Sequence, residues 1–375
     1  MAPPAPAIVG FSDLPTEALD EIARRVGPLD NVLCSAVCRP WRRALRTTRL
    51  RLLGRRPDRP HQIYIENLLW RAPVVKVSPN YIETYRYGTQ RGPYPVETVV
   101  DRDVARSRII GSSYGWAVTV DDDTWDMFLL DPFTGRSFPL PPFSDSLPGK
   151  QRLEPKGGTF WKPDRNSRLW RHMFRKAALA PGRRLGTYAV MLLHSNGRGL
   201  SYLAPGATSW AGLRPPRGMP HKYLDVILHK GAFYTVSCYG EVNAWVPDGD
   251  GGLRARPVTK PLREQVWAVL AESMSGDGIL MVSSTDTRES SDEDNCYSFS
   301  STDDYWGRPK SVRRWVESDR QWLPVESREE MNLIVGDGCC LYVPARYGGR
   351  YDGWRSSGSH WFLPYVPRLD PAFWH

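Results

Sequence analysis

The sequence predicts a mainly β protein with a small all-α module at its N-terminus. Three observations carry this prediction. Apolar positions recur at helical spacing only near the start of the chain, whereas from about residue 61 short runs of Val, Tyr, Leu and Trp alternate with Gly, Asp, Asn and Pro. The chain contains 15 Trp, 17 Tyr and 11 Phe, which suit half-buried sheet surfaces. Its 375 residues allow one large domain and one small one.

The N-terminal module is predicted to hold three short helices between residues 13 and 50. The apolar residues of the first recur three or four positions apart: Leu19, Ile22, Ala23 and Val26. Asp30 can cap a second helix, and Pro40 can occupy the first turn of a third. Each helix is too short to be stable alone, so we expect their combined apolar face to pack on something else.

Strand, turn and strand units recur through the rest of the chain, at intervals of very roughly 40–70 residues, near the blade periods of propellers. They are centred on Trp116, Tyr188, Phe233, Leu280 and Leu341. A propeller is favoured over a sandwich because its four-stranded blades repeat radially and protect their edges, which suits a long domain. We therefore predict a kelch-like β-propeller and leave the number of blades open.

Trp116 is predicted to lie in an inner blade element, because Gly115 precedes it and the apolar run 117–120 continues as a strand. We expect it to be buried; the alternative is an exposed anchor for a substrate.

Two stretches interrupt the strand pattern and are predicted to be surface loops. Residues 144–176 are rich in Lys, Arg, Pro and Gly, and residues 285–304 combine acidic residues with serines. The acidic stretch is either simply solvated, or folds back on the basic N-terminal module, or carries regulatory phosphates.

Residues 11–45 contain an ordered set of motif positions: Leu14-Pro15, Ile22, Ala36-Val37-Cys38 and Trp41-Arg42. In this order they resemble an F-box. The resemblance implies a three-helix unit that binds a Skp-type adaptor and, through it, a cullin-RING ligase. A unit this small cannot bury its own apolar face, and in the family the adaptor supplies the missing surface.

The adaptor-binding residues that the resemblance implies are Leu14, Pro15, Leu19, Ile22, Val26, Val32, Leu33, Val37 and Trp41. The alternative is that some of them, especially Val37 and Trp41, pack only within the module. Ala18, Asn31 and Cys34 depart from the residues common in the family, and we expect these departures to weaken adaptor binding.

The second domain carries its own resemblance, on Gly111–Trp116, Leu129–Arg136, Leu140–Pro142, Arg314–Glu317, Trp322 and Val335–Tyr342. These islands are similar to the plant F-box family with a C-terminal KIB-type β-propeller. The implied organisation is a disordered N-terminus at 1–10, an F-box at 11–50, a basic linker at 51–62 and the propeller at 63–370.

The formal charge of +9 favours acidic partners without identifying one. A dense arginine run between Arg39 and Arg59 reads as a solvated face and linker, or as a nuclear-import patch or a site for an acidic partner. Nucleic-acid binding is not favoured, because Trp41 is the only aromatic side chain interleaved with this run.

No signal peptide, apolar span or N-glycosylation acceptor occurs, so we expect no membrane association and a place in the nucleus, the cytoplasm or both.

The sequence lacks the motifs of common enzyme classes, and we expect no cofactor and no metal. His221, His229 and Cys238 come nearest to a ligand set, but their spacing along predicted strands favours ordinary structural positions. The six cysteines read as reduced thiols. The predicted function is a non-catalytic F-box adaptor that recruits a protein substrate, whose identity stays open, for ubiquitination and degradation. The alternatives are a non-degradative scaffold or sequestering factor and, less favoured, a propeller enzyme.

Overall fold

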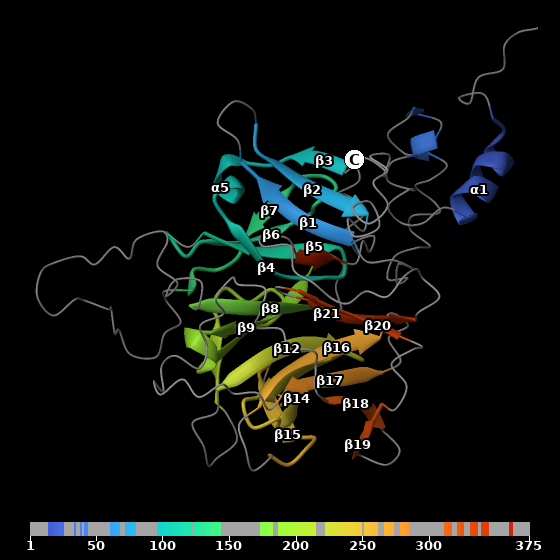
Figure 1. Ribbon diagram of the computed structural model, residues 1–375. Coiled ribbons are helices and arrows are strands. Elements are labelled where there is room, and N and C mark those ends of the chain that lie inside the picture. Colours follow the sequence, from blue (N-terminus) through green and yellow to red (C-terminus); the bar gives the residue numbers. More distant parts are fainter. Residues whose placement is uncertain are drawn as a thin grey trace, which may run out of the picture.

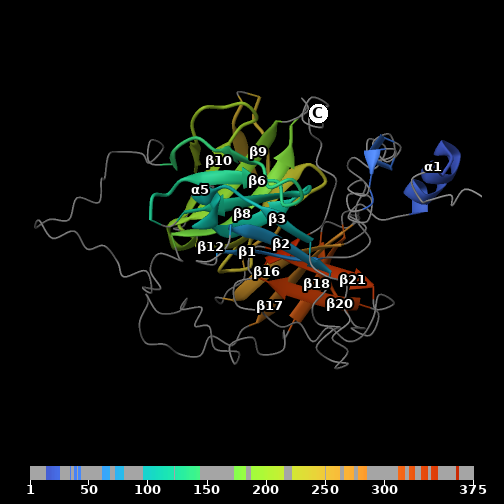
Figure 2. The ribbon, with the colours of Figure 1, turned by 90° about the horizontal axis from the view of Figure 1, so that it is seen from above.

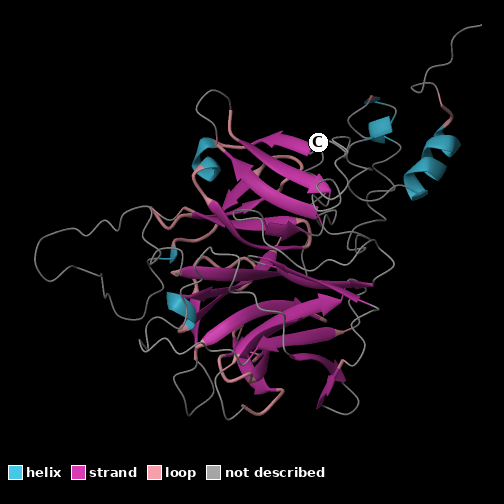
Figure 3. Ribbon diagram, in the orientation of Figure 1, coloured by secondary structure: helices cyan, strands magenta, loops and turns pink. Residues whose placement is uncertain are grey.

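The computed structural model describes two parts of the chain, a short helical region and a large set of sheets (Figures 1 and 3). The described residues are 14–25, 34, 38–39, 41–43, 61–67, 72–79, 96–121, 123–143, 173–182, 187–214, 222–249, 251–261, 266–273, 278–284, 311–316, 321–325, 331–336, 339–344 and 360–362.

The elements follow one another in the order expected for a helical module before a β domain. The helices are α1 (Thr16–Arg25), α5 (Arg102–Ala105) and the 3-10 turn η4 (Ser195–Gly197). The strands are β1 (His61–Glu66), β2 (Val74–Pro79), β3 (Val96–Val99), β4 (Arg108–Ser113), β5 (Trp116–Val120), β6 (Met127–Leu130), β7 (Ser137–Pro139), β8 (Phe174–Pro181), β9 (Tyr188–His194), β10 (Gly199–Leu203), β11 (Ala211–Leu213), β12 (Tyr223–His229), β13 (Ala232–Ser237), β14 (Val242–Pro247), β15 (Leu253–Pro257), β16 (Trp267–Ser273), β17 (Ile279–Ser284), β18 (Ser311–Val316), β19 (Gln321–Pro324), β20 (Met331–Gly336), β21 (Cys339–Pro344) and β22 (His360–Phe362).

The strands form antiparallel sheets in which sequence neighbours pair. Four sheets have four strands, in the orders β22-β1-β2-β3, β4-β5-β6-β7, β11-β10-β9-β8 and β12-β13-β14-β15. The fifth has the order β19-β18-β17-β16-β21-β20, because β16 and β21 pair in parallel at Glu272↔Leu341 and Ser273↔Tyr342. This arrangement is the predicted set of blade-like meanders.

The innermost strands of these sheets form a closed circuit. Contacts run from β22 to β4, then to β8, β12, β16 and β21, and from β21 back to β22. β22, near the C-terminal end, pairs with β1, so a late segment closes the ring against an early one. The sheets therefore have the radial arrangement of a propeller, and the mainly β prediction is confirmed. Helix α1 lies to one side of them in both views (Figures 1 and 2).

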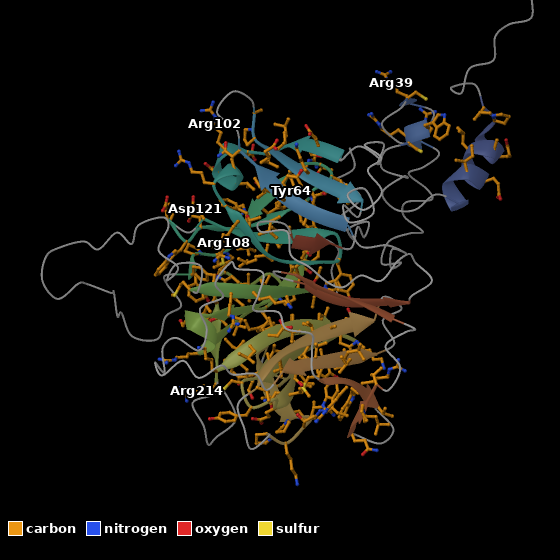
Figure 4. All side chains as sticks on the ribbon, in the orientation of Figure 1. Arg39, Tyr64, Arg102, Arg108, Asp121 and Arg214 are labelled. Carbon is orange, nitrogen blue, oxygen red and sulfur yellow. The ribbon has the colours of Figure 1, made fainter. Side chains whose placement is uncertain are left out.

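Connections between strands alternate between the two faces of this ring. Residues that follow or precede strands on one face include Arg102 before β4, Asp121 between β5 and β6, and Arg214 after β11. All three lie along the left edge of Figure 4, whereas Arg39 of the helical module lies at the upper right. The face formed by these connections therefore lies on the side of the sheets away from the helical module.

Two aspartates shape the turns of the β4–β7 sheet by the same chemistry. Asp121 Oδ1 accepts hydrogen bonds from the backbone N–H of Asp123 and Thr124, at 2.8 and 3.3 Å. Asp131 Oδ1 accepts from Phe133 and Thr134 at 2.9 and 3.4 Å. Aspartate favours such turns because its carboxylate replaces a backbone acceptor.

The apolar core lies between neighbouring sheets rather than in one central mass. One buried cluster joins Val118 and Leu129 to Val190 and Leu192. Others join β8–β11 to β12–β15 and β12–β15 to β16–β19. Inner strands such as β5, β9 and β12 are buried along their whole length, because each face packs on an adjacent sheet.

Two boundaries predicted from the sequence differ from the structure. The predicted loop 144–176 is wrong at its end, because residues 174–176 belong to β8; Phe174 is fully buried, and the charged pair that follows it disguised the strand. β1 begins at His61, so the predicted linker 51–62 also ran two residues too far. The first helix and the strands around Tyr188 and Phe233 are confirmed. The acidic stretch 285–304 lies outside the described residues.

Candidate functional site

The first candidate site is the helical module, which is organised around two buried side chains. Leu19 of α1 is 2% exposed and Trp41 is 8% exposed. Leu14, Ile22, Cys34 and Cys38 pack against this pair and are themselves only half-buried. The cluster is small, so its rim leaves apolar surface available to a partner.

Local sequence explains how α1 presents these residues. The backbone N–H of Leu19 donates to the carbonyl oxygen of Pro15 at 3.1 Å, which starts the helical ladder directly behind the Leu14-Pro15 pair. Glu17 lies in the first turn, where a carboxylate interacts favourably with the helix dipole. Leu19 and Ile22 are three residues apart and therefore share one face of the helix.

The predicted adaptor-binding residues fall into three groups. Pro15 is exposed, and Leu14 and Ile22 are half-buried at the edge of the cluster. Leu19 and Trp41 lie inside it, as the packing alternative expected for Trp41. The remaining predicted residues, Val26, Val32, Leu33 and Val37, lie outside the described residues. Contact with an adaptor stays a prediction for each of them.

The second candidate site is the ring of inner strands, where polar side chains cross from one sheet to the next. Lys176 Nζ of β8 lies 2.5 Å from Asp225 Oδ1 of β12, with side-chain exposures of only 10% and 3%. The other oxygen, Oδ2, accepts the backbone N–H of Leu270 in β16 at 2.8 Å. Asp225 therefore links three consecutive inner strands through one carboxylate.

Two further polar contacts join neighbouring inner strands. Arg108 of β4 donates from Nη2 to the carbonyl oxygen of Phe174 in β8 at 2.8 Å. His229 Nδ1, at the end of β12, lies 3.1 Å from Glu272 Oε1 in β16. The sequence predicts an ordinary structural position for His229, and the structure places it beside this carboxylate and the ring of Tyr234.

His194 lies within a small polar group between β9 and β10. Its Nδ1 is 2.9 Å from Ser195 Oγ and its Nε2 is 3.0 Å from Ser201 Oγ. Burial, including ring contact with Phe143, lowers the pKa of His194 to about 4. The imidazole is therefore neutral near pH 7, and its two nitrogens are matched to hydroxyl groups.

Metal and thiol chemistry find little support in the part of the chain that the structure describes. Within those residues no group of three or more His, Cys, Asp or Glu is placed to hold a metal ion. Among the described residues, Cys34, Cys38 and Cys238 are not in disulfide bonds. No described helix is long and apolar enough to span a membrane.

The sequence predictions missed the cross-strand pair Lys176 and Asp225. Lys176 lies at the end of the stretch 144–176, which the sequence predicts to be a loop, and no role is predicted for Asp225. A usable signal did exist, because an isolated charge inside an otherwise apolar strand is expensive to bury without a partner. The sequence could not identify the partner, which lies 49 positions away.

Comparisons with solved structures give only distant matches. They include YCF48 bound to a D1 peptide, at 11% identity and a TM-score of 0.36, covering 68% of this chain and 61% of that one. YCF48 from Cyanidioschyzon merolae matches at 9% identity and a TM-score of 0.36, covering 69% of each chain. Virginiamycin B lyase from Staphylococcus aureus matches at 10% identity and 0.35, covering 78% of this chain and 71% of that one. Similarities this low carry no argument, and no curated protein matched the sequence.

Comparison with family models is decisive. The F-box domain model matches residues 11–53, and the KIB1-4 beta-propeller model matches residues 86–353. β1 and β2 precede the second range and pair in one sheet with β22, which follows it, so this sheet extends the propeller at both ends. The chain is thus an F-box protein that belongs to the KIB1-4 β-propeller family.

Proposed function

We propose that this protein is the substrate-recognition subunit of a Skp-cullin-F-box ubiquitin ligase. The observation that carries the proposal is the order of its parts, with an F-box followed by a large propeller on one chain. F-box domains generally bind Skp-type adaptors of cullin-RING ligases, and a propeller offers a broad rigid surface for a second protein.

The geometry of the helical module supports adaptor binding. Only Leu19 and Trp41 are buried among its described apolar residues, while Leu14 and Ile22 stay partly exposed beside them. Covering these side chains with an adaptor would remove apolar surface from water, at about 25 cal/mol per Å². Large apolar groups near the centre of an interface usually dominate its energy.

The proposed mechanism is positional. The F-box fixes the chain on the adaptor, the propeller holds a substrate, and the assembled ligase keeps substrate lysines close to the ubiquitin-carrying enzyme. Tethering of this kind raises the effective concentration of the reacting groups without new chemistry. In this mechanism the chain itself makes and breaks no bonds, and it acts in the nucleus, the cytoplasm or both.

The test is a reconstituted ligase containing the full-length chain, its adaptor, cullin and the ubiquitin-transfer enzymes, with partners captured from plant tissue while the proteasome is blocked. We expect captured partners to be ubiquitinated only when the chain is present. A non-degradative scaffold would bind the same partners and leave them unmodified, which would refute the ligase function. Propeller variants unable to bind a partner serve as the negative control.

A further inference from the structure

Two neighbouring sheets enclose one shared apolar cluster. In the β12–β15 sheet, Tyr234 and Ala244 are buried in this cluster, and in the β16–β19 sheet Leu270 and Met281 are buried in it. Both sheets continue outward from the inner strands β12 and β16, to β15 in one sheet and to β18 and β19 in the other (Figure 1). The sides of β15, β18 and β19 that face the cluster lie at the periphery of the two sheets.

Two tryptophans lie on that facing surface. Trp315 of β18 pairs directly with Trp322 of β19 across the strands. Their ring centroids are 5.5 Å apart, with an angle of 54° between the planes. Both rings pack against the shared cluster, yet both are only half-buried. Each therefore keeps part of its aromatic surface in solvent next to the core.

Three arginines lie on the sides of the two sheets that face the shared cluster. Arg256 of β15 is in register with Ala244, which faces the shared cluster, so Arg256 and Arg254 lie on the same side of their sheet. Arg313 stands two residues before Trp315 and thus shares its side of β18. Arg254 and Arg256 are exposed, and Arg313 is half-buried.

No described carboxylate neutralises these three guanidinium groups, which make no ion pair with any residue that the structure describes. The described acidic residues of the two sheets are engaged elsewhere. Asp225 binds Lys176, Glu272 lies beside His229, and Asp248 accepts the backbone N–H of Gly252. Within the described part of the chain, this surface therefore combines half-exposed aromatic rings with guanidinium groups that have no acidic partner there.

We propose that this Trp–Arg surface, made by Trp315, Trp322, Arg254, Arg256 and Arg313, binds an acidic segment with an apolar anchor on the protein substrate. Tryptophan and arginine are the residue types that most often dominate protein interfaces. Guanidinium groups bind carboxylates in a bidentate fashion, and the chain's net charge of +9 attracts an acidic partner from a distance. This assignment rests on the proposed function, for which it names the class of substrate.

The geometry favours a peptide over single-stranded nucleic acid. Successive bases stack on aromatic faces that are open to them along a basic groove. Trp315 and Trp322 are tilted by 54° to each other and partly covered by the cluster, so their rings do not form two parallel open platforms for successive bases. An apolar side chain flanked by carboxylates matches the half-exposed rings and the arginines on the facing sides of the two sheets.

The probe is a fluorescein-labelled peptide of alternating Asp and Leu residues, titrated with the full-length chain in fluorescence anisotropy. Reversing the charge in the double variant Arg254→Glu with Arg256→Glu should weaken binding about tenfold, which corresponds to roughly 1.4 kcal/mol. The matched control reverses Arg102 and Arg106, two exposed arginines at α5 on another sheet, and should leave binding unchanged. Salt should weaken the wild-type complex and have little effect on the double variant.

Three results would overturn the assignment. The first is equal binding by the wild type and the Arg254/Arg256 variant. The second is tight binding of a labelled single-stranded oligonucleotide that the same variant abolishes, and the third is self-association of the chain through these arginines. Adaptor capture by the same preparations separates this proposal from the proposed function. If the chain captures the adaptor but does not bind the peptide, only the assignment of the Trp–Arg surface is refuted. If the chain does not bind the adaptor, the proposed function is refuted.

Discussion

The helical module and the propeller bury their apolar side chains on very different scales. The described part of the module has Leu19 and Trp41 as its buried pair, whereas one inter-sheet cluster alone unites buried residues from β4–β6 and β8–β10. The propeller also closes on itself through β22 and β1. Among the described residues, the propeller therefore holds far larger apolar clusters than the helical module, and our proposal is that the module completes its core on a partner.

The most damaging change to the propeller should be Trp116→Ala. Trp116 is 1% exposed, its ring meets Phe138 and Tyr188 edge to face at 5.6 and 5.4 Å, and its Nε1 donates to the Tyr188 hydroxyl. We expect a loss of about 3–5 kcal/mol in the free energy of unfolding. Chemical denaturation of the full-length chain measures it. The burial of Trp116 contradicts the alternative of an exposed anchor, and an unchanged unfolding curve of the variant would contradict the packing role.

Lys176→Met should be next in size. It would leave the Asp225 carboxylate buried with its backbone donors but without its cation. Removing one member of a buried pair costs about 3 kcal/mol or more. The same denaturation assay applies, with Lys260→Met as the control at an exposed lysine. Equal stability of the two variants would contradict the role of the Asp225 carboxylate in linking β8, β12 and β16.

Gly135→Ala tests how closely two sheets approach each other at a turn. Gly135 has a φ of +72°, and an added Cβ would lie 2.0 Å from the carbonyl oxygen of Val99 at the end of β3. The left-handed conformation costs an alanine about 1–2 kcal/mol, and the contact adds to it. We expect a clear fall in melting temperature. Gly206→Ala is the matched control, because Gly206 also has a positive φ (+80°) but has open space around it. If both variants lowered the melting temperature equally, the contact with Val99 would not contribute to the effect.

Lowering the pH should destabilise the folded chain, because His194 is buried as a neutral imidazole. Its pKa is lowered from 6.5 to about 4 in the folded chain, so the unfolded chain binds a proton first as the pH falls. The neutral imidazole is fully compatible with folding above pH 6.5, and stability is lost as the pH decreases from 6.5 toward 4. Between pH 7 and pH 5 this amounts to about 2 kcal/mol.

The variant His194→Gln isolates that contribution. It cannot titrate, so its free energy of unfolding should change less between pH 7 and pH 5 than that of the wild type, by about 2 kcal/mol. Parallel pH dependence of the two proteins would show that the His194 imidazole is already accessible to protons in the folded state.

Much of this fold could be predicted from local patterns. The helical spacing around Leu19 and Ile22 indicated α1, and the alternation around Tyr188 and Phe233 indicated paired strands. Ring closure by β22 could not be predicted, because a run of three residues is too short to show the alternation of a strand and does not indicate its partner. The pair of Lys176 and Asp225 was also beyond reach, since a contact between distant segments depends on how the sheets pack and local propensity does not encode it.

The candidate sites also divide into features that a local sequence pattern predicts and features that depend on how distant strands pair. Leu14 and Pro15 were predicted from an ordered motif, whereas the Trp–Arg surface emerged only from register. The strand register places Arg256 opposite Ala244 in one sheet and Trp315 opposite Trp322 in the next. The propeller fold makes these two sheets face each other. The sequence predicted Trp322 as part of a family island and gave no sign of its partners.

The most direct test of the account is a calorimetric titration of a Skp-type adaptor into the full-length chain, beside the double variant Leu14→Ala with Pro15→Ala. Both residues lie at the accessible rim of the module. We expect binding by the wild type with a negative heat-capacity change, as apolar surface is buried, no binding by the variant, and the same unfolding curve for the propeller in both. Undiminished binding by the variant, or adaptor capture by residues 60–375 alone, would contradict the claim that the helical module completes its core on the adaptor.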